Sequence, residues 1–321
     1  MRGRSTLRRV VGGLLGVVVG GLTLAVATRW VDLVTPETTA VQALVPVWGL
    51  ALVLVVAFAG ALRHRGVALA GVLPALVVLV VFGASLRSQT VATSPADPTA
   101  VTVMSSNLEY GQADAGQVVA AVKDHGVAVL VLAEVTPEAL TRLDARGLTT
   151  LLPYAAGTAE EGASGTVIRS RYPLTAIGSD EQPHGPQLGF RSPLARVERP
   201  GAPFLVKGVH TLPPTAWPQW WVDDLASLAA LQDGEPTSVP LVLAGDFNAS
   251  ADHPAYRRMA DGLTDVNRAA GGGWIRTWPH GWPVPAFVQL DHVLVRGFDT
   301  VAAGTVVLDG TDHAAVWGTV R

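Results

Sequence analysis

The sequence predicts an α/β protein in which two mixed β-sheets are covered by helices and preceded by three transmembrane helices. Three observations support this prediction. Three long apolar runs lie near the N-terminus, the rest of the chain has the composition of a soluble domain, and its apolar strands are followed by helices in some places and by strands in others. Because βα and ββ order are mixed, we expect mixed sheets rather than one purely parallel sheet.

Three segments are long and apolar enough to cross a bilayer. They span Val10–Thr28, Ala43–Leu62 and Val67–Leu86 and contain no Asp, Glu, Lys or Arg. At about 1.5 Å per residue, a helix of roughly 20 residues matches the ~30 Å hydrocarbon core. A buried helix of a soluble protein is rarely apolar on all sides over such a length. Signal-peptide cores are shorter, and two further apolar runs follow, so we interpret the first run as an uncleaved anchor.

The basic residues predict how these spans are oriented. Positively charged loops stay in the cytoplasm, which predicts a cytoplasmic N-terminus. After three spans, the rest of the chain lies outside, so the predicted location is the cell membrane, multi-pass, with an extracytoplasmic domain. Arginines precede the first span and separate the second from the third: Arg2, Arg4, Arg8, Arg9, Arg63 and Arg65.

The chain divides into a membrane anchor at 1–87, a linker at 88–100 that contains Pro, Ser and Thr, and a domain at 101–321. The domain carries 23 acidic and 15 basic residues, a net charge of −8. A strongly basic surface is typical of nucleic-acid-binding proteins, and this domain lacks that composition. Nothing in the sequence indicates an obligate protein partner.

Within the domain, β-branched apolar runs predict strands, and capping residues predict helix starts. Asp114 and Thr136 each have a side-chain oxygen that can accept a hydrogen bond from the first turn of a helix, and Pro137 suits the first helical position. Predicted helices cover 114–125, a segment from 136 onward, 217–231 and 253–260. Predicted strands cover 101–105, 127–133, 166–169, 192–198, 204–209, 239–244, 288–295, 300–308 and 314–320.

Polar residues capable of coordination or acid–base chemistry lie at the ends of many predicted strands. Loops at one edge of a sheet are where active sites are usually assembled. Each residue alone is better explained as a turn or a helix cap, but all of them together predict one shared site. They are Asn107, Glu134, His210, Asp246, Asn248, Asp291, Asp312 and His313.

The segment Gly245-Asp246-Phe247-Asn248 follows the apolar run 239–244. Side chains two residues apart in an extended segment face the same way, so we expect Asp246 and Asn248 to converge on one ligand. A carboxylate suits a hard cation or an attacking water, and a carboxamide suits a phosphate oxygen. The alternative is a plain turn, because Asp and Asn favour turns. The other strand-end residues favour the site.

The order of these motifs resembles the endonuclease/exonuclease/phosphatase superfamily, the DNase I-like metal-dependent phosphoesterases. The motifs are Asn107, Glu134, Ser164–Leu174, His210, Gly-Asp-Phe-Asn, Leu-Asp-His-Val-Leu around Asp291, and Thr-Asp-His at 311–313. The resemblance covers roughly Val101 to Arg321. It implies a four-layered α/β sandwich and metal-dependent hydrolysis of phosphoesters. The three spans resemble those of membrane-anchored bacterial members.

The resemblance implies that Glu134 is the principal Mg²⁺ ligand, with Asn107 and Asp312 beside it; Mn²⁺ is a possible substitute. It also implies that Asp291 and His313 form an acid–histidine pair. Mg²⁺ prefers carboxylate and water oxygens and can stabilise developing negative charge by several kcal/mol. An imidazole held by a carboxylate is a stronger base than a free one. The sequence contains no cysteine, so it has no cysteine–histidine cluster that would indicate zinc.

For the remaining site residues, the resemblance implies that Asp246 and Asn248 orient the nucleophilic water and hold the scissile phosphate. It implies that His210 binds the phosphate or protonates the leaving oxygen. The sequence departs from the family pattern at Gln289, where many members have an arginine. That departure leaves the substrate contacts open.

The predicted function is a membrane-anchored, metal-dependent phosphodiesterase or nuclease that acts on phosphoester bonds outside the cytoplasm. Two alternatives remain: a phospholipid or small-molecule phosphoesterase, and a catalytically silent, membrane-tethered binding module. The expected partners are the phosphoester substrate and the lipid bilayer. Tryptophans near His210 and Asp291 either pack the fold, which we favour, or line the rim of the site; they are Trp217, Trp220, Trp221, Trp274, Trp278 and Trp282.

Overall fold

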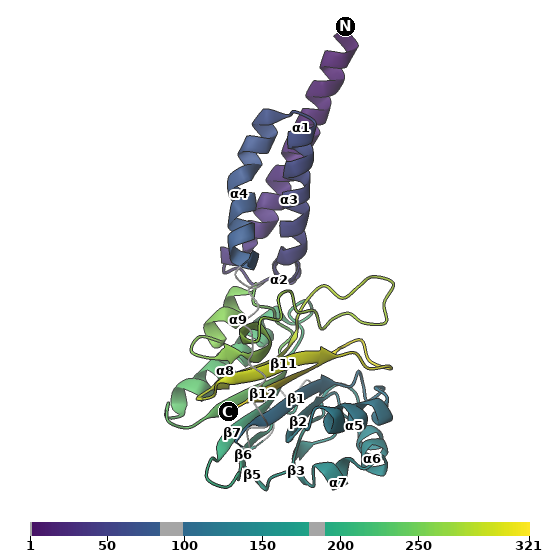
Figure 1. The fold of residues 1–321 in the computed structure, drawn as a ribbon, viewed down its shortest axis with the longest axis vertical. Helices are drawn as coiled ribbons and strands as arrows, with labels where there is room; N and C mark the ends of the chain where they lie inside the picture. The colour runs from purple at the N-terminus through teal and green to yellow at the C-terminus, as the bar shows by residue number, and fades with distance from the viewer. Residues whose placement is uncertain (1, 84–98, 180–189) are drawn as a thin grey trace.

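The computed structural model describes residues 2–83, 99–179 and 190–321. A bundle of long helices stands at one end of an α/β domain, and the N-terminus lies at the end of the bundle that is farther from the domain (Figure 1). The predicted linker at 88–100 lies mostly outside the described residues, as does the end of the third predicted span, residues 84–86.

The bundle consists of α1 (Arg2–Ala27), α3 (Val45–Ala61) and α4 (Arg65–Gly83), with η1 (Thr28–Trp30) and α2 (Pro36–Ala43) near the domain. The first helix, taken to Trp30, and α4 are each long and apolar enough to cross a membrane. Helices α2 and α3 make a third candidate only if the pair, bent by 61°, is counted as one span. The three predicted spans therefore correspond to two or three candidates.

Three arginines of the bundle, Arg8, Arg63 and Arg65, lie at its far end, whereas Arg29 lies at the end that meets the domain. Arg8 donates a hydrogen bond to the carbonyl oxygen of Arg63 at 3.1 Å, so the start of α1 lies beside the α3–α4 connection. The α1–α3 connection lies at the opposite end, against the α/β domain (Figure 1). This alternation is the one expected of three antiparallel spans.

The domain contains two six-stranded mixed sheets, in which one pair of neighbours is parallel and the others are antiparallel. The parallel pairs are β1–β2 in the first sheet and β7–β8 in the second. The first sheet has the order β11 (Thr300–Val306), β12 (Ala315–Val320), β1 (Val101–Asn107), β2 (Val129–Ala133), β4 (Thr166–Ser170), β3 (Tyr154–Thr158). The second has the order β5 (Leu174–Ala176), β6 (Leu194–Val197), β7 (Phe204–His210), β8 (Leu241–Asp246), β10 (Asp291–Arg296), β9 (Thr264–Asp265).

A parallel pair needs a crossover, and helices supply it in both sheets. Helix α5 (Ala115–Asp124) connects β1 to β2, and α8 (Pro218–Gly234) connects β7 to β8. The two strands of each pair therefore end at the same edge of their sheet. Strand β12 is antiparallel to β1, and β10 is antiparallel to β8, so both begin at that edge. Residues at the ends of six strands can meet there.

Both predicted helix caps are present. The Asp114 side chain accepts a hydrogen bond from the backbone N–H of Gln117, and Thr136 accepts one from Ala139 at the start of α6 (Pro137–Ala145). Caps of this kind contribute about 1 kcal/mol each. The remaining helices of the domain are α7 (Leu148–Leu151), α9 (Pro254–Met259) and α10 (Val266–Ala269).

Three apolar clusters hold four layers together. The central cluster lies between the sheets and includes Val103 from the first sheet and Val242 from the second. The outer face of the first sheet packs Leu130 against α5, α6 and α7. The outer face of the second packs Leu243 against α8 and α9. The predicted arrangement of two mixed sheets flanked by helices is confirmed.

The bundle docks on the domain through polar contacts at α9. Arg29 pairs with Asp252, and Arg258 pairs with Asp32 at 2.7 Å. His253 accepts a hydrogen bond at Nδ1 from the backbone N–H of Ser250, so its Nε2 carries the proton and donates to the carbonyl oxygen of Thr39 at 3.0 Å. The helical segment and the domain are therefore joined by contacts between residues far apart in the sequence.

Some predicted boundaries were wrong. The predicted strand 288–295 begins only at Asp291. Before it, Val288 pairs with Trp278 in an isolated bridge, and the Thr277 hydroxyl accepts hydrogen bonds from the backbone N–H groups of Leu290 and Asp291. Asp291 is thus the first residue of β10, at the edge of the sheet.

Candidate active site

Asn107, the last residue of β1, links the strand ends of the two sheets at one edge. Its Nδ2 donates hydrogen bonds to Oε1 of Glu134 at 3.0 Å and to Oδ2 of Asp246 at 3.1 Å. Glu134 follows β2 in the first sheet, and Asp246 ends β8 in the second. One side chain therefore connects the strand ends of both sheets, and the predicted convergence of these three residues is observed.

Asp246 lies at the centre of a row across the second sheet. It is the cross-strand neighbour of His210 in the parallel pair β7–β8 and of Asp291 in the antiparallel pair β8–β10. Gly245, just before it, permits this close packing, because a Cβ there would lie 1.8 Å from the carbonyl oxygen of Val209. The backbone therefore requires glycine where the chain enters the site.

Asn248 is placed differently from the sequence prediction. The chain leaves the extended conformation at this residue, where φ is +46°. Its Nδ2 donates to the carbonyl oxygen of Thr211 at 2.8 Å, and its backbone N–H donates to Oδ1 of Asp246 at 2.8 Å. Asn248 therefore contacts the Asp246 carboxylate through its backbone N–H, so the expectation of an extended segment with both side chains on one face was wrong.

Two histidines approach the Asp246 carboxylate. Nε2 of His210 lies 3.9 Å from Oδ2 of Asp246 and 3.7 Å from Oε1 of Glu134. Nε2 of His313 lies 3.8 Å from the same oxygen of Asp246. Nδ1 of His210 contacts the carbonyl oxygen of Ala163 at 3.1 Å, and the ring stacks on Phe190. Contacts at Nδ1 thus leave Nε2 of His210 facing the site.

His313 is held by the predicted acid partner. Its Nδ1 donates to Oδ2 of Asp291 at 2.8 Å, and both residues are buried. Nε2 of His313 also lies 3.7 Å from Oδ1 of Asp312. The second oxygen of Asp312, Oδ2, accepts a hydrogen bond from Nε1 of Trp278 at 2.8 Å. The predicted acid–histidine pair is thus formed, and its imidazole projects Nε2 toward the acidic centre.

The loops of the site hold strained backbone. Five described non-glycine residues have positive φ, and four of them lie here: Glu109, Tyr110, Glu134 and Asn248. Such conformations cost about 1–3 kcal/mol each and concentrate at functional sites. Hydrogen bonds compensate part of this cost, since the backbone N–H of Tyr110 donates to Oε2 of Glu134 at 2.9 Å.

The electrostatics of the site are dominated by carboxylates. Among the described residues, the ion-pair partners of these carboxylates are histidines. The carboxylates are those of Glu134, Asp246, Asp291 and Asp312. Burial raises the pKa of Glu134 and of Asp246 above their usual range. Buried carboxylates require compensating positive charge, and a bound cation could supply it in addition to the histidines.

The pKa values of the two histidines shift in opposite directions in this environment. Burial lowers the pKa of His210. Burial also acts to lower the pKa of His313, but the carboxylates of Asp291 and Asp246 outweigh it and raise that pKa to about 10. Chemically similar side chains with separated pKa values are typical of acid–base sites.

One group of donors among the described residues of this site could hold a divalent cation. Ligand atoms of Asp246, Asp291 and His313 lie within 4.8 Å of one another. The predicted set of Glu134, Asn107 and Asp312 adjoins that group. Asn107 donates a hydrogen bond to Asp246, and Oδ1 of Asp312 lies 3.7 Å from Nε2 of His313. Oδ1 of Asp291 is buried without a hydrogen-bond partner among the described residues. An unpartnered carboxylate oxygen and clustered acids are the donor chemistry that a hard cation requires.

Several supporting residues were not predicted from the sequence. Oε2 of Glu109 accepts a hydrogen bond from the backbone N–H of Asp312 at 2.7 Å. The Thr311 hydroxyl donates to the carbonyl oxygen of Asn107 at 3.0 Å and accepts from the backbone N–H of His313 at 3.1 Å. Glu109 lies two residues after Asn107, and this spacing is the only sequence signal that points to it.

The tryptophans divide between the two interpretations. Trp221 is buried and belongs to the core on α8, as packing predicted. Trp278 contacts Asp312 and therefore belongs to the site. Four others are exposed: Trp217, Trp220, Trp274 and Trp282.

Solved structures share this fold. TDP2 of D. rerio, complexed with a single-stranded DNA product, is 17% identical, with a TM-score of 0.56, and the match covers 70% of this chain and 99% of that one. An endonuclease/exonuclease/phosphatase family protein from Leptotrichia buccalis is 12% identical, with a TM-score of 0.52 over 69% and 99%. One from Bacteroides thetaiotaomicron is 16% identical, with a TM-score of 0.51 over 70% and 98%. At these identities the likeness concerns the fold.

The sequence itself gives the family. No curated protein matches the chain significantly. A family model described as Endonuclease/Exonuclease/phosphatase family matches residues 104–313, a range that includes all eight strand-end site residues. The chain therefore belongs to the endonuclease/exonuclease/phosphatase family, whose members are phosphoesterases.

Proposed function

We propose that this protein is a membrane-anchored, divalent-metal-dependent phosphodiesterase whose catalytic domain lies outside the cytoplasm. One observation carries the proposal: strand ends from both sheets bring Glu134, Asp246, Asp291 and two histidines to one acidic centre bridged by Asn107. A phosphodiester repels hydroxide, so its hydrolysis needs positive charge near the phosphate and a base for water. This centre has residues suited to both tasks.

We assign Glu134 as the principal ligand of Mg²⁺, with Asn107 and Asp312 as further ligands and Mn²⁺ as a possible substitute. When bound, the cation would withdraw charge from the non-bridging phosphate oxygens. Its location beside Asp246 would place it near the group that orients water. The adjoining cluster of Asp246, Asp291 and His313 is the alternative metal position.

In this proposal, Asp291 holds the imidazole of His313 so that Nε2 faces the substrate. The bond from His313 Nδ1 to Asp291 fixes the ring. The neighbouring carboxylates raise the pKa of this imidazole to about 10, and a cation bound to them would lower it, so that the neutral ring could take up a proton as a general base. Such catalysis contributes about 10²- to 10⁴-fold.

Asp246 orients the attacking water, because the Nε2 atoms of His210 and His313 both approach its Oδ2, at 3.9 and 3.8 Å. His210, whose Nε2 also faces this carboxylate, binds a phosphate oxygen or protonates the leaving group. Asn248 fixes the Asp246 carboxylate through its backbone N–H, and we expect its carboxamide to contact the phosphate.

Membrane anchoring is supported by the surface of the bundle. Large apolar side chains point outward from all three long helices and include Leu14, Leu54 and Leu73. A water-exposed apolar surface of this extent is unusual in soluble proteins. Alkaline carbonate extraction of membranes tests the anchor: the full chain should remain in the membrane pellet, and release into the supernatant would contradict anchoring.

The substrate class divides into two candidates. The structurally similar TDP2 was crystallised with single-stranded DNA, which favours a nucleic acid. The net charge of −8 on the domain and its attachment to a membrane favour a phospholipid or small phosphodiester. Parallel assays with duplex DNA, single-stranded DNA and phospholipid vesicles separate them, since the true class should be hydrolysed preferentially.

Hydrolysis of bis-p-nitrophenyl phosphate by the purified full chain tests the chemistry. We expect activity in Mg²⁺ that EDTA removes, and we expect Glu134→Ala and His313→Ala to lower it by at least about 10²-fold. An exposed acid on α8, Asp223, provides the matched control as Asp223→Ala. Activity that persists in EDTA and in both site variants would contradict the proposed mechanism. Calorimetric titration with Mg²⁺ or Mn²⁺ excludes a silent binding module if either ion binds.

A further inference from the structure

A long loop between α10 and β10 carries exposed apolar side chains at its tip. The tip, residues 281–285 with the sequence Gly-Trp-Pro-Val-Pro, is exposed throughout, and Trp282 and Val284 are 53% and 47% exposed. Between Arg276 and Asp291 the chain contains no Asp, Glu, Lys or Arg. Exposed apolar surface of this kind marks a site of contact with a membrane or another macromolecule.

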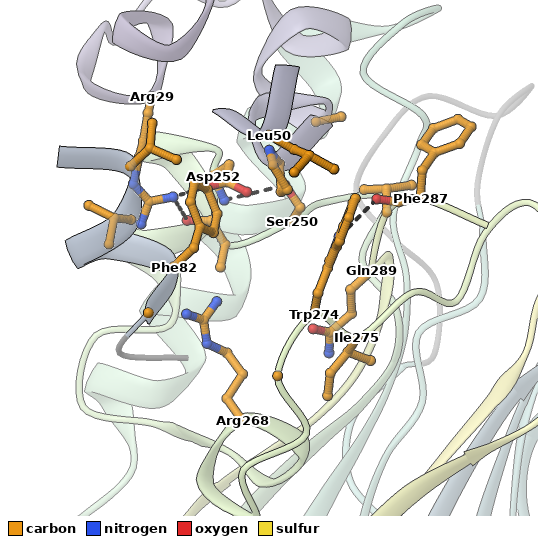
Figure 2. A pocket seen from close by; sticks show the side chains of 18 of the residues that line it. Arg29, Leu50, Phe82, Ser250, Asp252, Arg268, Trp274, Ile275, Phe287 and Gln289 are labelled. Atoms are coloured by element: carbon orange, nitrogen blue, oxygen red, sulfur yellow. Dashed lines mark hydrogen bonds and ion pairs between the residues drawn. The ribbon is translucent and has the colours of Figure 1, made fainter. Parts of the chain in front are cut away.

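The stem of this loop lies beside the helical bundle. Nε1 of Trp274 donates to the carbonyl oxygen of Phe287 at 3.2 Å, which joins the two sides of the stem (Figure 2). Both residues line a cavity together with Leu50 of α3 and Phe82 of α4. Leu50 and Phe82 lie within the predicted spans 43–62 and 67–86. The stem therefore lies at the depth where these helices would leave the bilayer.

The tip has the composition of a segment that enters the interfacial layer of a bilayer. In Figure 1 it belongs to the yellow-green loop that projects sideways from the end of the domain that meets the bundle. Tryptophan is enriched at membrane–water interfaces, because its ring is apolar and its N–H is polar. Pro283 and Pro285 have no backbone N–H, so they bring no donor that lipid would leave unpaired.

The tip is also connected to the acidic centre. Trp282 packs against Trp278, with ring centroids 5.2 Å apart. Nε1 of Trp278 in turn donates to Oδ2 of Asp312 at 2.8 Å. Two indole side chains therefore separate the tip from a residue of the site, so a bilayer that contacts the tip has its headgroups close to the site.

We infer that the tip inserts into the leaflet that adjoins the domain, and that the phosphodiester hydrolysed at the acidic centre is a phospholipid of that leaflet. Water adds to phosphorus, one ester P–O bond breaks, and the leaving oxygen takes up a proton, which yields a phosphomonoester and an alcohol. The net charge of −8 on the domain disfavours a nucleic acid, whereas insertion of uncharged apolar side chains needs no charge attraction. This inference rests on the anchoring and the hydrolysis proposed above.

Single-cysteine probes test insertion directly, because the chain contains no cysteine. Val284→Cys in the full chain is labelled with an environment-sensitive nitrobenzoxadiazole dye and reconstituted into phosphatidylcholine vesicles. We expect a blue-shifted emission that lipid carrying a spin label near its headgroup quenches. The matched control is Ile177→Cys, an exposed apolar position next to β5 at the far end of the domain, where we expect neither effect. Equal emission and quenching at the two positions would overturn the inference.

The rates on two substrates test the substrate class. In phosphatidylcholine vesicles, Val284→Asp should lower the formation of phosphomonoester, measured by ³¹P NMR, by about tenfold, because it places a charge in the interface. Its hydrolysis of soluble bis-p-nitrophenyl phosphate should stay at the wild-type rate. Ile177→Asp is the control and should change neither rate. Equal rates of phospholipid hydrolysis in Val284→Asp and wild type would refute the role of the tip.

Hydrolysis of DNA but not of phospholipid by the wild-type chain would refute the inferred substrate. Failure of the proposed function is seen separately, since a chain released by carbonate is not anchored. A chain that hydrolyses neither substrate while the probe at position 284 reports insertion would confirm the membrane contact and refute the catalytic part. Unchanged thermal midpoints of the variants in detergent show that the fold is intact.

Discussion

The hydrogen bond between His313 and Asp291 is the best-defined interaction of the acidic centre. Both side chains are buried, and Asp291 accepts from Nδ1 while Nε2 faces Asp246. We predict that Asp291→Asn lowers kcat by about 10²-fold or more, because the amide neither holds the required tautomer nor stabilises the imidazolium.

The measurement is the steady-state rate in saturating Mg²⁺. Asp223→Asn, on the exposed face of α8, removes the same charge and should leave the rate unchanged. A wild-type rate for Asp291→Asn would remove His313 from the proposed proton transfer.

His253 gives the junction of bundle and domain a dependence on pH. Burial lowers its pKa from 6.5 to about 4, so the neutral ring is the form that the fold holds. The unfolded chain takes up a proton near pH 6.5 while the folded chain does not. Stability is therefore full above about pH 6.5 and falls as the pH drops toward 4, by up to about 3 kcal/mol.

Thermal midpoints of the full chain in detergent at pH 7.5 and pH 5 measure this effect. We predict a lower midpoint at pH 5 and a smaller drop in His253→Gln, which keeps a donor near Thr39 and does not titrate. Equal drops in the two proteins would show that other groups determine the acid sensitivity.

At the scale of the element, β8 depends on Gly245. A methyl group there would overlap the Val209 carbonyl oxygen of the neighbouring strand, and the strands would have to separate at the site. We predict that Gly245→Ala destabilises the protein by about 3 kcal/mol or more, as measured by thermal or denaturant unfolding. Gly234→Ala, at the end of α8 where a Cβ meets nothing within 4 Å, is the control and should change stability little. Comparable effects of the two substitutions would refute the packing argument.

Strong local signals made most elements predictable. Buried strands such as β2 and β8 are uninterrupted apolar runs, and the caps at Asp114 and Thr136 are direct chemical signals. The strand Tyr154–Thr158 was not predicted, because it lies at a sheet edge, is mostly exposed and contains Ala and Gly. The short strands at 174–176 and 264–265 give even less pattern.

The composition of the site was predictable, but its assembly was not. The order of strand-end residues indicated which side chains belong together, and the register of β7, β8 and β10 does place His210, Asp246 and Asp291 in one row. Such register depends on pairing between distant segments, as does the contact of Thr311 with Asn107. The turn at Asn248 and the support from Glu109 arise from backbone conformations that local patterns do not encode.

If the three long helices each cross the membrane, the domain and the α3–α4 connection lie on opposite sides of it. The chain contains no cysteine, so single introduced cysteines can be labelled without background. We predict that Thr175→Cys on β5 reacts with an impermeant maleimide in intact cells, whereas Leu62→Cys at the end of α3 reacts only after permeabilisation. The reverse pattern would place the domain in the cytoplasm.

We propose that a divalent cation held at the Glu134 edge of the acidic centre supports phosphodiester hydrolysis. The most direct test of this proposal is the rate of bis-p-nitrophenyl phosphate hydrolysis by the EDTA-treated full chain as Mg²⁺ is restored. We predict a rate that rises from background and saturates with Mg²⁺, and a Glu134→Gln variant that needs at least about tenfold more Mg²⁺ to reach half of its maximal rate. A rate that is independent of Mg²⁺, or a Glu134→Gln curve that superimposes on wild type, would contradict it.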